Sequence, residues 1–220
     1  MKTVNIHVMS ADPALRPYAR LIKKETSEAL NLISKYILFN NIDICILQNP
    51  QAISYGVATS ETTNEHTLSI SLNVKHKNFK KLLHEELLGS LCHGLHFLSN
   101  YQKMGYPNTL IESFIQKGLA IHFEMAITNK NASIHCRVNK DELQKMIQKS
   151  KRYYFSRNYL INYDDWFYGS KKKKIPAYTM SALGYYFIKK YLKANPDKTI
   201  FDIVNKNIEK LVKDILGLED

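Results

Sequence analysis

The stretch Leu91-Cys92-His93-Gly94-Leu95-His96-Phe97 lies at the centre of an apolar pattern that decides the fold. Across residues 79–100, leucines recur at three- and four-residue spacing, namely at Leu83, Leu87, Leu88, Leu91, Leu95 and Leu98. This spacing predicts a helix with a broad apolar face buried in a core. A second helix is predicted over residues 108–127, which include the run Ile115-Gln116-Lys117-Gly118-Leu119-Ala120.

The residues before the leucine-rich helix predict a β-α-β opening and one further strand. Alternating polar and apolar residues predict strands over 4–8, 42–47 and 67–72. Apolar residues at helical spacing predict a helix over 14–38. Residues 49–66 begin with Asn-Pro and are mainly polar, which predicts a loop. The strand over 67–72 would then lead directly into the leucine-rich helix.

The rest of the chain is predicted to be mainly helical. Amphipathic patterns predict helices over 140–151, 176–192 and 200–216. A stretch rich in tyrosine and lysine, residues 153–174, shows no regular period and is predicted to be irregular.

Length and composition favour one folded α+β domain. The chain has 220 residues, of which 45% are hydrophobic and 11% aromatic, which is enough to bury a core. No linker or repeat divides it, so a single domain over 1–220 is expected, with 1–76 mainly sheet-forming around one long helix and 77–220 mainly helical.

Cysteine usage and the N-terminus indicate a cytoplasmic protein. Cys45, Cys92 and Cys136 form no CxxC pair and leave an odd thiol under any pairing, which argues against a disulfide framework and fits a reducing compartment. The first residues lack the apolar core of a signal peptide, and no apolar run approaches the length of a membrane span. Export that needs no signal peptide stays open.

Several segments, taken in order, resemble the predicted zinc-dependent proteases of bacteria, a zincin-like family with an HExxH helix and a downstream EGLA segment. The resemblance covers about residues 44–192 and includes the leucine-rich helix and the run Thr109-Leu-Ile-Glu-Ser-Phe-Ile-Gln-Lys-Gly-Leu-Ala120. It continues through Trp166-Phe-Tyr-Gly169 and Ile175-Pro-Ala-Tyr-Thr-Met-Ser-Ala-Leu-Gly184. It implies a zincin-like metallopeptidase fold, with a small N-terminal sheet packed on an active-site helix and a helical C-terminal half. The implied activity is peptide hydrolysis by zinc-bound water.

The positions that carry the family's chemistry are changed in this chain. The resemblance places the first zinc-binding histidine on His93, the catalytic glutamate on Gly94, the second histidine on Phe97 and the EGLA glutamate on Lys117. Glycine cannot abstract a proton, phenylalanine offers no lone pair, and an ammonium group is repelled by a divalent cation. The sequence therefore predicts a degenerate, catalytically inactive member, with no cofactor expected.

A cleft that binds a peptide or protein segment would survive this loss. An edge of the strand over 67–72 would offer main-chain hydrogen bonds to an extended segment. The family's later segment carries a Gly-Tyr pair where this chain has Met180-Ser181, so a hydroxyl able to stabilise an oxyanion is absent there. The candidate cleft residues are His93, His96, Phe97, Lys117, Glu112, Tyr178 and Ser181. The simpler interpretation of the histidines is that they are hydrogen-bonded structural residues. Lys117 would either fill the vacant metal position by pairing with Glu85, Glu86 or Glu112, which keeps the shape of the cleft, or be an ordinary surface lysine.

The alternative is an active zinc peptidase with displaced ligands. Cys92 and His96 are four residues apart, and Glu86 precedes His93 by seven, so each pair shares a helix face. Zinc would then be the cofactor. The simpler interpretation makes the glutamate part of a solvated turn and the cysteine a small buried side chain.

A third hypothesis rests on positive charge. The net charge is +11, and Lys171, Lys172, Lys173, Lys174 and Arg152 form a basic patch among tyrosines. Cations neutralise phosphates and rings stack on bases, so this region is the candidate for binding nucleic acid or an acidic partner. No recognised nucleic-acid module accompanies it, and a solvated loop explains the same residues.

Overall fold

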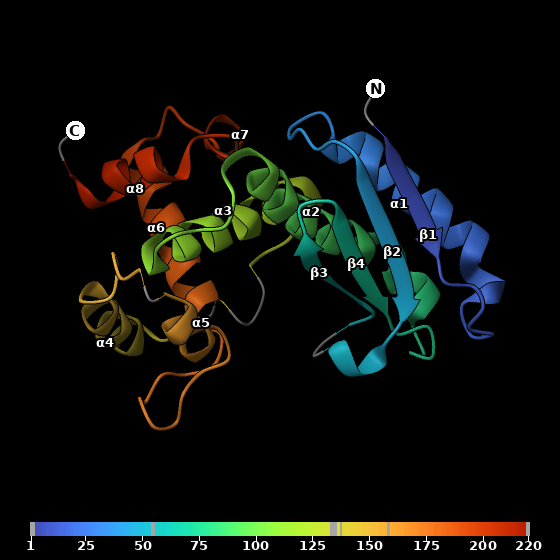
Figure 1. The fold of residues 1–220 in the computed structure, drawn as a ribbon, viewed down its shortest axis with the longest axis horizontal. Helices are drawn as coiled ribbons and strands as arrows, with labels where there is room; N and C mark the ends of the chain where they lie inside the picture. The colour runs from blue at the N-terminus through green and yellow to red at the C-terminus, as the bar shows by residue number, and fades with distance from the viewer. Residues whose placement is uncertain (1–2, 54–55, 133–135, 137, 158, 219–220) are drawn as a thin grey trace. The chain divides into compact units, whose positions relative to one another are not determined.

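We describe residues 3–53, 56–132, 136, 138–157 and 159–218 of a computed structural model (Figure 1). The chain forms two compact units. The N-terminal unit comprises Met1–Lys103 with Ile127–Asn129, and the C-terminal unit comprises Met104–Ala126 with Lys130–Asp220. The first contains a four-stranded sheet and long helices, so the expected α+β class is confirmed.

The sheet of the N-terminal unit has the strand order β1-β2-β4-β3. Its strands are β1 (Val4–Val8), β2 (Ile42–Gln48), β3 (Ala58–Asn64) and β4 (Thr67–Leu72). The first three in spatial order are parallel, and β3 runs antiparallel to β4. Alternate side chains of β2 and β4 are buried, because α1 and α2 cover one face of the sheet (Figure 1).

The prediction that the strand over 67–72 offers an edge is wrong, because β4 is hydrogen-bonded to β2 on one side and to β3 on the other. The loop predicted over 49–66 contains the edge strand β3 and a short 3-10 helix, η2 (Pro50–Ala52). Strand β3 has the sequence ATSETTN, which lacks an apolar alternation. Threonine nonetheless favours a strand that is solvated on its outer side.

Helix α1 (Ala19–Ile33) is shorter than the helix predicted over 14–38. A 3-10 turn, η1 (Arg16–Tyr18), precedes it and contains Pro17. Proline has no N–H to donate, so the α-helical hydrogen-bond pattern begins only after it.

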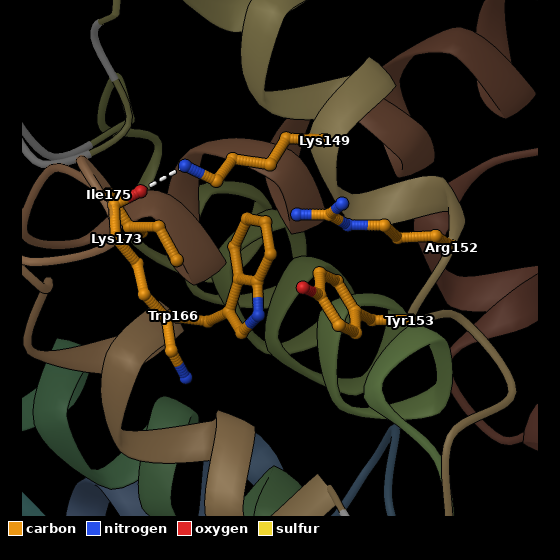
Figure 2. A pocket seen from close by; sticks show the side chains of 6 residues that line it. All are labelled: Lys149, Arg152, Tyr153, Trp166, Lys173 and Ile175. Carbon is orange, nitrogen blue, oxygen red and sulfur yellow. Dashed lines mark hydrogen bonds between the residues drawn. The ribbon is translucent and has the colours of Figure 1, made fainter.

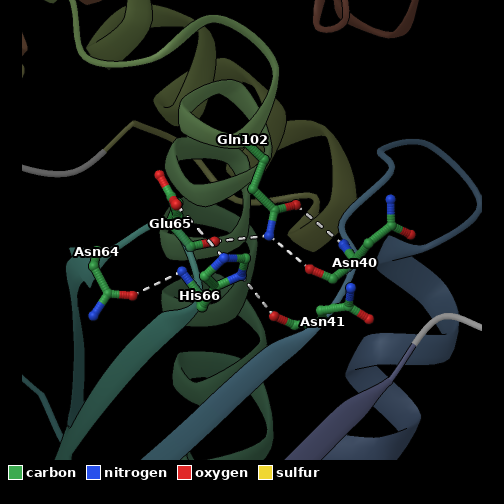
Figure 3. A network of polar contacts seen from close by, with 6 residues as sticks. All are labelled: Asn40, Asn41, Asn64, Glu65, His66 and Gln102. Atoms are coloured by element: carbon green, nitrogen blue, oxygen red, sulfur yellow. Dashed lines mark hydrogen bonds and ion pairs between the residues drawn. The ribbon is translucent and has the colours of Figure 1, made fainter.

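Helix α2 (Phe79–Met104) packs against the sheet and is fixed to it by polar contacts. Near its end, Gln102 Nε2 donates to Asn40 O at 2.6 Å and to Glu65 O at 2.7 Å, and Asn40 N donates back to Gln102 Oε1 at 3.1 Å (Figure 3). His66 completes this network through a 3.0 Å contact between its Nδ1 and Asn41 O. One side chain of α2 thus holds two loops at the same end of the sheet.

The C-terminal unit is helical in its described residues. Its helices are α3 (Leu110–Thr128), α4 (Lys140–Lys151), α5 (Tyr159–Phe167), α6 (Thr179–Ala194), α7 (Ile200–Ile203) and α8 (Ile208–Leu216). The irregular stretch predicted over 153–174 contains α5, and the single helix predicted over 200–216 is two helices. Asn207 separates them by accepting a hydrogen bond from Lys210 N at 3.1 Å as an N-cap.

Two glycines allow α3 and α6 to cross closely. A Cβ on Gly118 would lie 2.2 Å from Gly184 O, and a Cβ on Gly184 would lie 2.3 Å from Phe114 O. Beside this crossing the Phe114 ring packs against Trp166 and Phe187, with centroids 5.6 and 6.4 Å away. These aromatic residues form the core of the unit.

None of the helices in the described ranges is long and apolar enough to cross a membrane.

Candidate functional site

Helix α2 presents His93 and Phe97 together on a half-buried face. Their ring centroids are 5.4 Å apart, with an angle of 37° between the planes. Residues four apart lie one turn apart on a helix, which is the arrangement that two metal-binding histidines require. Here the second position holds a phenyl ring, so the pair makes an aromatic contact and offers one imidazole.

Gly94 follows His93 in α2 and is buried where this helix packs on the sheet. A Cβ on Gly94 would lie 2.5 Å from Leu68 Cδ1 and 3.0 Å from Ser60 Cβ. Thr62 Oγ1 also donates to Gly94 O at 3.4 Å. The sheet occupies the space that a side chain at this position needs. A glutamate here would require the side chains of Leu68 and Ser60 to shift.

His96 and Cys92 are turned into the core. Both are fully buried. His96 Nε2 lies 3.0 Å from Asn100 Nδ2, one turn further along α2, and its ring meets Phe97 edge-on. The displaced-ligand pair Cys92 and His96 therefore lies inside the hydrophobic core, away from the half-buried face of α2 that carries His93.

Glu86 is tied to the start of β3. Its Oε2 accepts a hydrogen bond from Val57 N at 2.5 Å. Gly56, which precedes Val57, has a φ of 79°. A Cβ on Gly56 would lie 2.0 Å from the same carboxylate oxygen of Glu86. Glu86 thus closes the loop that leads into the edge strand.

Another set of ligand-type side chains, which the sequence analysis missed, lies on the outside of α1 and α2. Glu25, Glu28 and His84 bring ligand atoms within 4.8 Å of one another. His84 Nδ1 contacts Glu25 Oε2 at 2.5 Å. His84 precedes His93 by nine residues, so the two project from opposite sides of α2. The spacing of the two glutamates is visible in the sequence, but their meeting with a histidine 56 residues further along is not.

In the C-terminal unit, Lys117 lies among aromatic rings. Its Nζ is 5.2 Å from the centroid of the Phe167 ring, which stacks on Tyr163 at 5.7 Å. Removal from water lowers the pKa of Lys117 to about 8, although the nearby Glu124 and Cys136 act in the opposite direction. Burial in turn raises the pKa of the Cys136 thiol to about 12, which keeps it protonated.

The other cleft candidates of this unit have structural contacts. Glu112 Oε2 accepts from Asn108 N at 2.6 Å, which caps α3. Tyr178 stands at the start of α6 with a φ of 62°, and its N donates to Phe167 O at 3.1 Å. Ser181 is buried in the first turn of α6. A non-glycine residue in the left-handed region is strained, so Tyr178 is held there by its surroundings.

The predicted basic patch is a closed turn. Ser170 and Ile175 pair through two backbone hydrogen bonds, 2.7 and 2.9 Å long, so Lys171, Lys172, Lys173 and Lys174 form an exposed tip. Arg152, which ends α4, places its guanidinium 4.8 Å from the centroid of the Tyr153 ring.

The N-terminal unit is an α+β unit whose sheet packs on the helix that carries His93 and Phe97. Residues 22–213 match the family described as "Predicted Zn-dependent protease". The chain belongs to this family, which confirms the resemblance seen in its sequence. Searches of curated proteins and of solved structures found no match.

The residues at the positions that the resemblance assigns to zinc do not fit that metal. The half-buried face of α2 offers the His93 imidazole, Phe97 presents a ring one turn further on, and Gly94, where the resemblance places the base, has no side chain and lies against Leu68. A zinc site of the usual kind needs three protein ligands and an activated water.

Proposed function

We propose that this chain is a catalytically inactive, zincin-like member of its family that binds an extended peptide or protein segment. The proposal rests chiefly on Gly94, which supplies no base and where a Cβ would meet the side chains of Leu68 and Ser60, so a larger residue could enter only if both of them moved. Phe97 adds to it, since its ring contacts His93 in place of a second ligand.

Strand β3 supports the binding part of the proposal. In the described residues it pairs with β4 alone, so its outer N–H and C=O groups face away from the sheet. Ser60 and Thr62 of β3 contact α2 at Gly94, which places this edge beside His93 and Phe97. An extended segment that pairs with β3 would gain main-chain hydrogen bonds. The side chains of His93 and Phe97 would then contact alternate residues of this segment.

Zinc stoichiometry tests the loss of chemistry. Untagged protein is equilibrated with zinc, freed of loosely bound ions and measured by elemental analysis beside His93→Ala, His96→Ala and His84→Ala. We expect no zinc that depends on His93, and any retained zinc to disappear with His84→Ala, because His84 stands with Glu25 and Glu28 on the opposite side of α2. Near one zinc per chain, lost in His93→Ala and kept in His84→Ala, would overturn the proposal.

Peptide binding is tested with fluorescein-labelled peptides from a tryptic digest of β-casein. Anisotropy should rise saturably, and mass spectrometry should find the peptides intact. Successive N–H groups of a strand point to opposite edges, so one of Thr59→Pro and Ser60→Pro removes an outward donor. The variant of this pair that keeps the native circular dichroism should lose binding. Unchanged binding in that variant would contradict the assignment to β3.

A further inference from the structure

A pocket in the C-terminal unit lies between α4, α5 and the turn formed by residues 170–175, called here the lysine turn (Figure 2). Its volume is about 150 Å³, and it is lined by Lys149, Arg152, Tyr153, Trp166, Lys173 and Ile175. It is separate from the face of α2 that carries His93 and Phe97, because all of the residues that line the pocket belong to the C-terminal unit.

The aromatic core of the unit fixes the pocket floor. Trp166 is almost fully buried, held by Phe114 at 5.6 Å and Tyr153 at 6.4 Å between ring centroids. Ile175 is buried as well, and its backbone pairs with Ser170 to close the lysine turn. The floor is therefore apolar, largely aromatic and preformed.

Cations from the end of α4 form the rim. The ammonium of Lys149 donates to the backbone oxygen of Lys173, and the guanidinium of Arg152 lies over the Tyr153 ring (Figure 2). Lys173 directs its own ammonium to Asp165, whose pKa this hydrogen bond lowers. The six lining residues, all within the described part of the chain, include no carboxylate. Lys149 and Arg152 therefore give the pocket a net positive rim.

We propose that this pocket binds a phosphate monoester carried on an aromatic or similarly flat apolar body. Guanidinium and ammonium groups are the usual protein partners of phosphate, and Arg152 can donate two parallel hydrogen bonds to it. The partly exposed ring of Tyr153 would contact the carrier, and the buried Trp166 ring would support it from below.

The pocket size favours a small ligand over a nucleic-acid chain. Its volume is only about 150 Å³. This accommodates one phosphate group with part of its carrier, which a free monoester can insert. A diester inside a polynucleotide has chain on both sides and fits less well. The four exposed lysines of the turn would then act only by attracting anions towards the pocket.

Fluorescence of Trp166 tests the proposal, because the chain contains one tryptophan. Phenyl phosphate should change this fluorescence saturably. Inorganic phosphate should bind more weakly because it lacks the carrier, and benzoate should bind more weakly because it has one negative charge and no third oxygen. Stronger binding of inorganic phosphate would assign the pocket to the free ion, and equal binding of benzoate would overturn the choice of phosphate.

Arg152→Gln and Lys151→Gln form a matched pair. Each removes one positive charge beside the same helix end, but Lys151 does not line the pocket. Loss of hydrogen bonds to a charged group corresponds to about tenfold weaker binding or more. Arg152→Gln should therefore weaken the affinity for phenyl phosphate by at least about tenfold. The affinity of Lys151→Gln should stay within about twofold of wild type. Equal losses would show diffuse attraction and overturn the proposal. So would the absence of a saturable change in wild-type protein with native circular dichroism.

Discussion

Lys117 shows how the environment of one side chain changes its chemistry. Packing around the ammonium lowers its pKa to about 8, and the Phe167 ring supplies a cation–π contact that offsets part of the lost hydration. The resemblance to the family places a metal-binding glutamate at this position. By that resemblance, lysine brings a positive charge where a negative one is expected.

Replacing Lys117 by methionine should stabilise the protein at pH 7. The folded-state pKa of about 8 lies below the ordinary value of 10.5, so folding disfavours the charged form. This penalty is full below pH 8 and disappears as the pH rises to 10.5. The advantage of Lys117→Met should therefore shrink between these pH values, as measured by urea unfolding. Lys190→Met, at an exposed position, is the control. A less stable Lys117→Met at pH 7 would contradict this account.

His122 should make the protein sensitive to acid. Its Nε2 lies 3.0 Å from Tyr185 O and its ring stacks on Tyr185, while burial is the main cause that lowers its pKa from 6.5. The unfolded state then binds a proton more readily, so stability contributed by neutral His122 is present above pH 6.5 and lost as the pH falls through the folded-state pKa. Urea unfolding should show this loss in wild type and a smaller one in His122→Asn. Equal slopes in both proteins would reject it.

At the scale of elements, two glycines predict different responses to alanine. At Gly118 the obstacle is the backbone oxygen of Gly184, whereas at Gly94 it is chiefly the end of the Leu68 side chain. Overpacking costs about 1–3 kcal/mol, and alanine returns about 1 kcal/mol of helix propensity. The net cost is therefore about 0–2 kcal/mol, and Gly118→Ala should lie at the upper end of this range, because backbone cannot rotate away. Gly94→Ala should cost less, and Leu68→Ala in the same chain should reduce that cost. Urea unfolding of the single and double variants measures these differences, and equal costs for the two glycines would contradict the prediction.

Sequence patterns predicted the elements that bury a regular apolar face. Strand β4 and helix α4 have the predicted bounds, and α2 and α3 differ by a few residues at their ends. Strand β3 was missed because an edge strand of threonine, serine and glutamate needs no apolar alternation. The same omission misplaced the sheet edge. The interior position of β4 depends on pairing with a segment that the sequence presents as a loop.

The candidate site was predictable only in part for a related reason. Substitutions at Gly94, Phe97 and Lys117 are visible once the family is recognised. The close approach of Leu68 to Gly94, the core position of His96 and the grouping of Glu25, Glu28 and His84 depend on how strands and helices pack. The pocket around Trp166 likewise joins segments whose spacing has no period.

At the scale of the whole molecule, the family match spans both compact units, and zinc bound by the folded chain would raise its stability. A ligand that binds only the folded state at one hundred times its Kd adds about 2.7 kcal/mol to the free energy of unfolding. We expect micromolar zinc, compared with a chelator, to leave the thermal midpoint of His84→Ala unchanged. This variant lacks the outer group of ligand-type side chains but keeps His93. A zinc-dependent rise in His84→Ala that disappears when His93→Ala is added would show that the degenerate site still binds metal. A rise seen in wild type and lost in His84→Ala would instead place the zinc between α1 and α2, where it stabilises the N-terminal unit without supplying the family's chemistry.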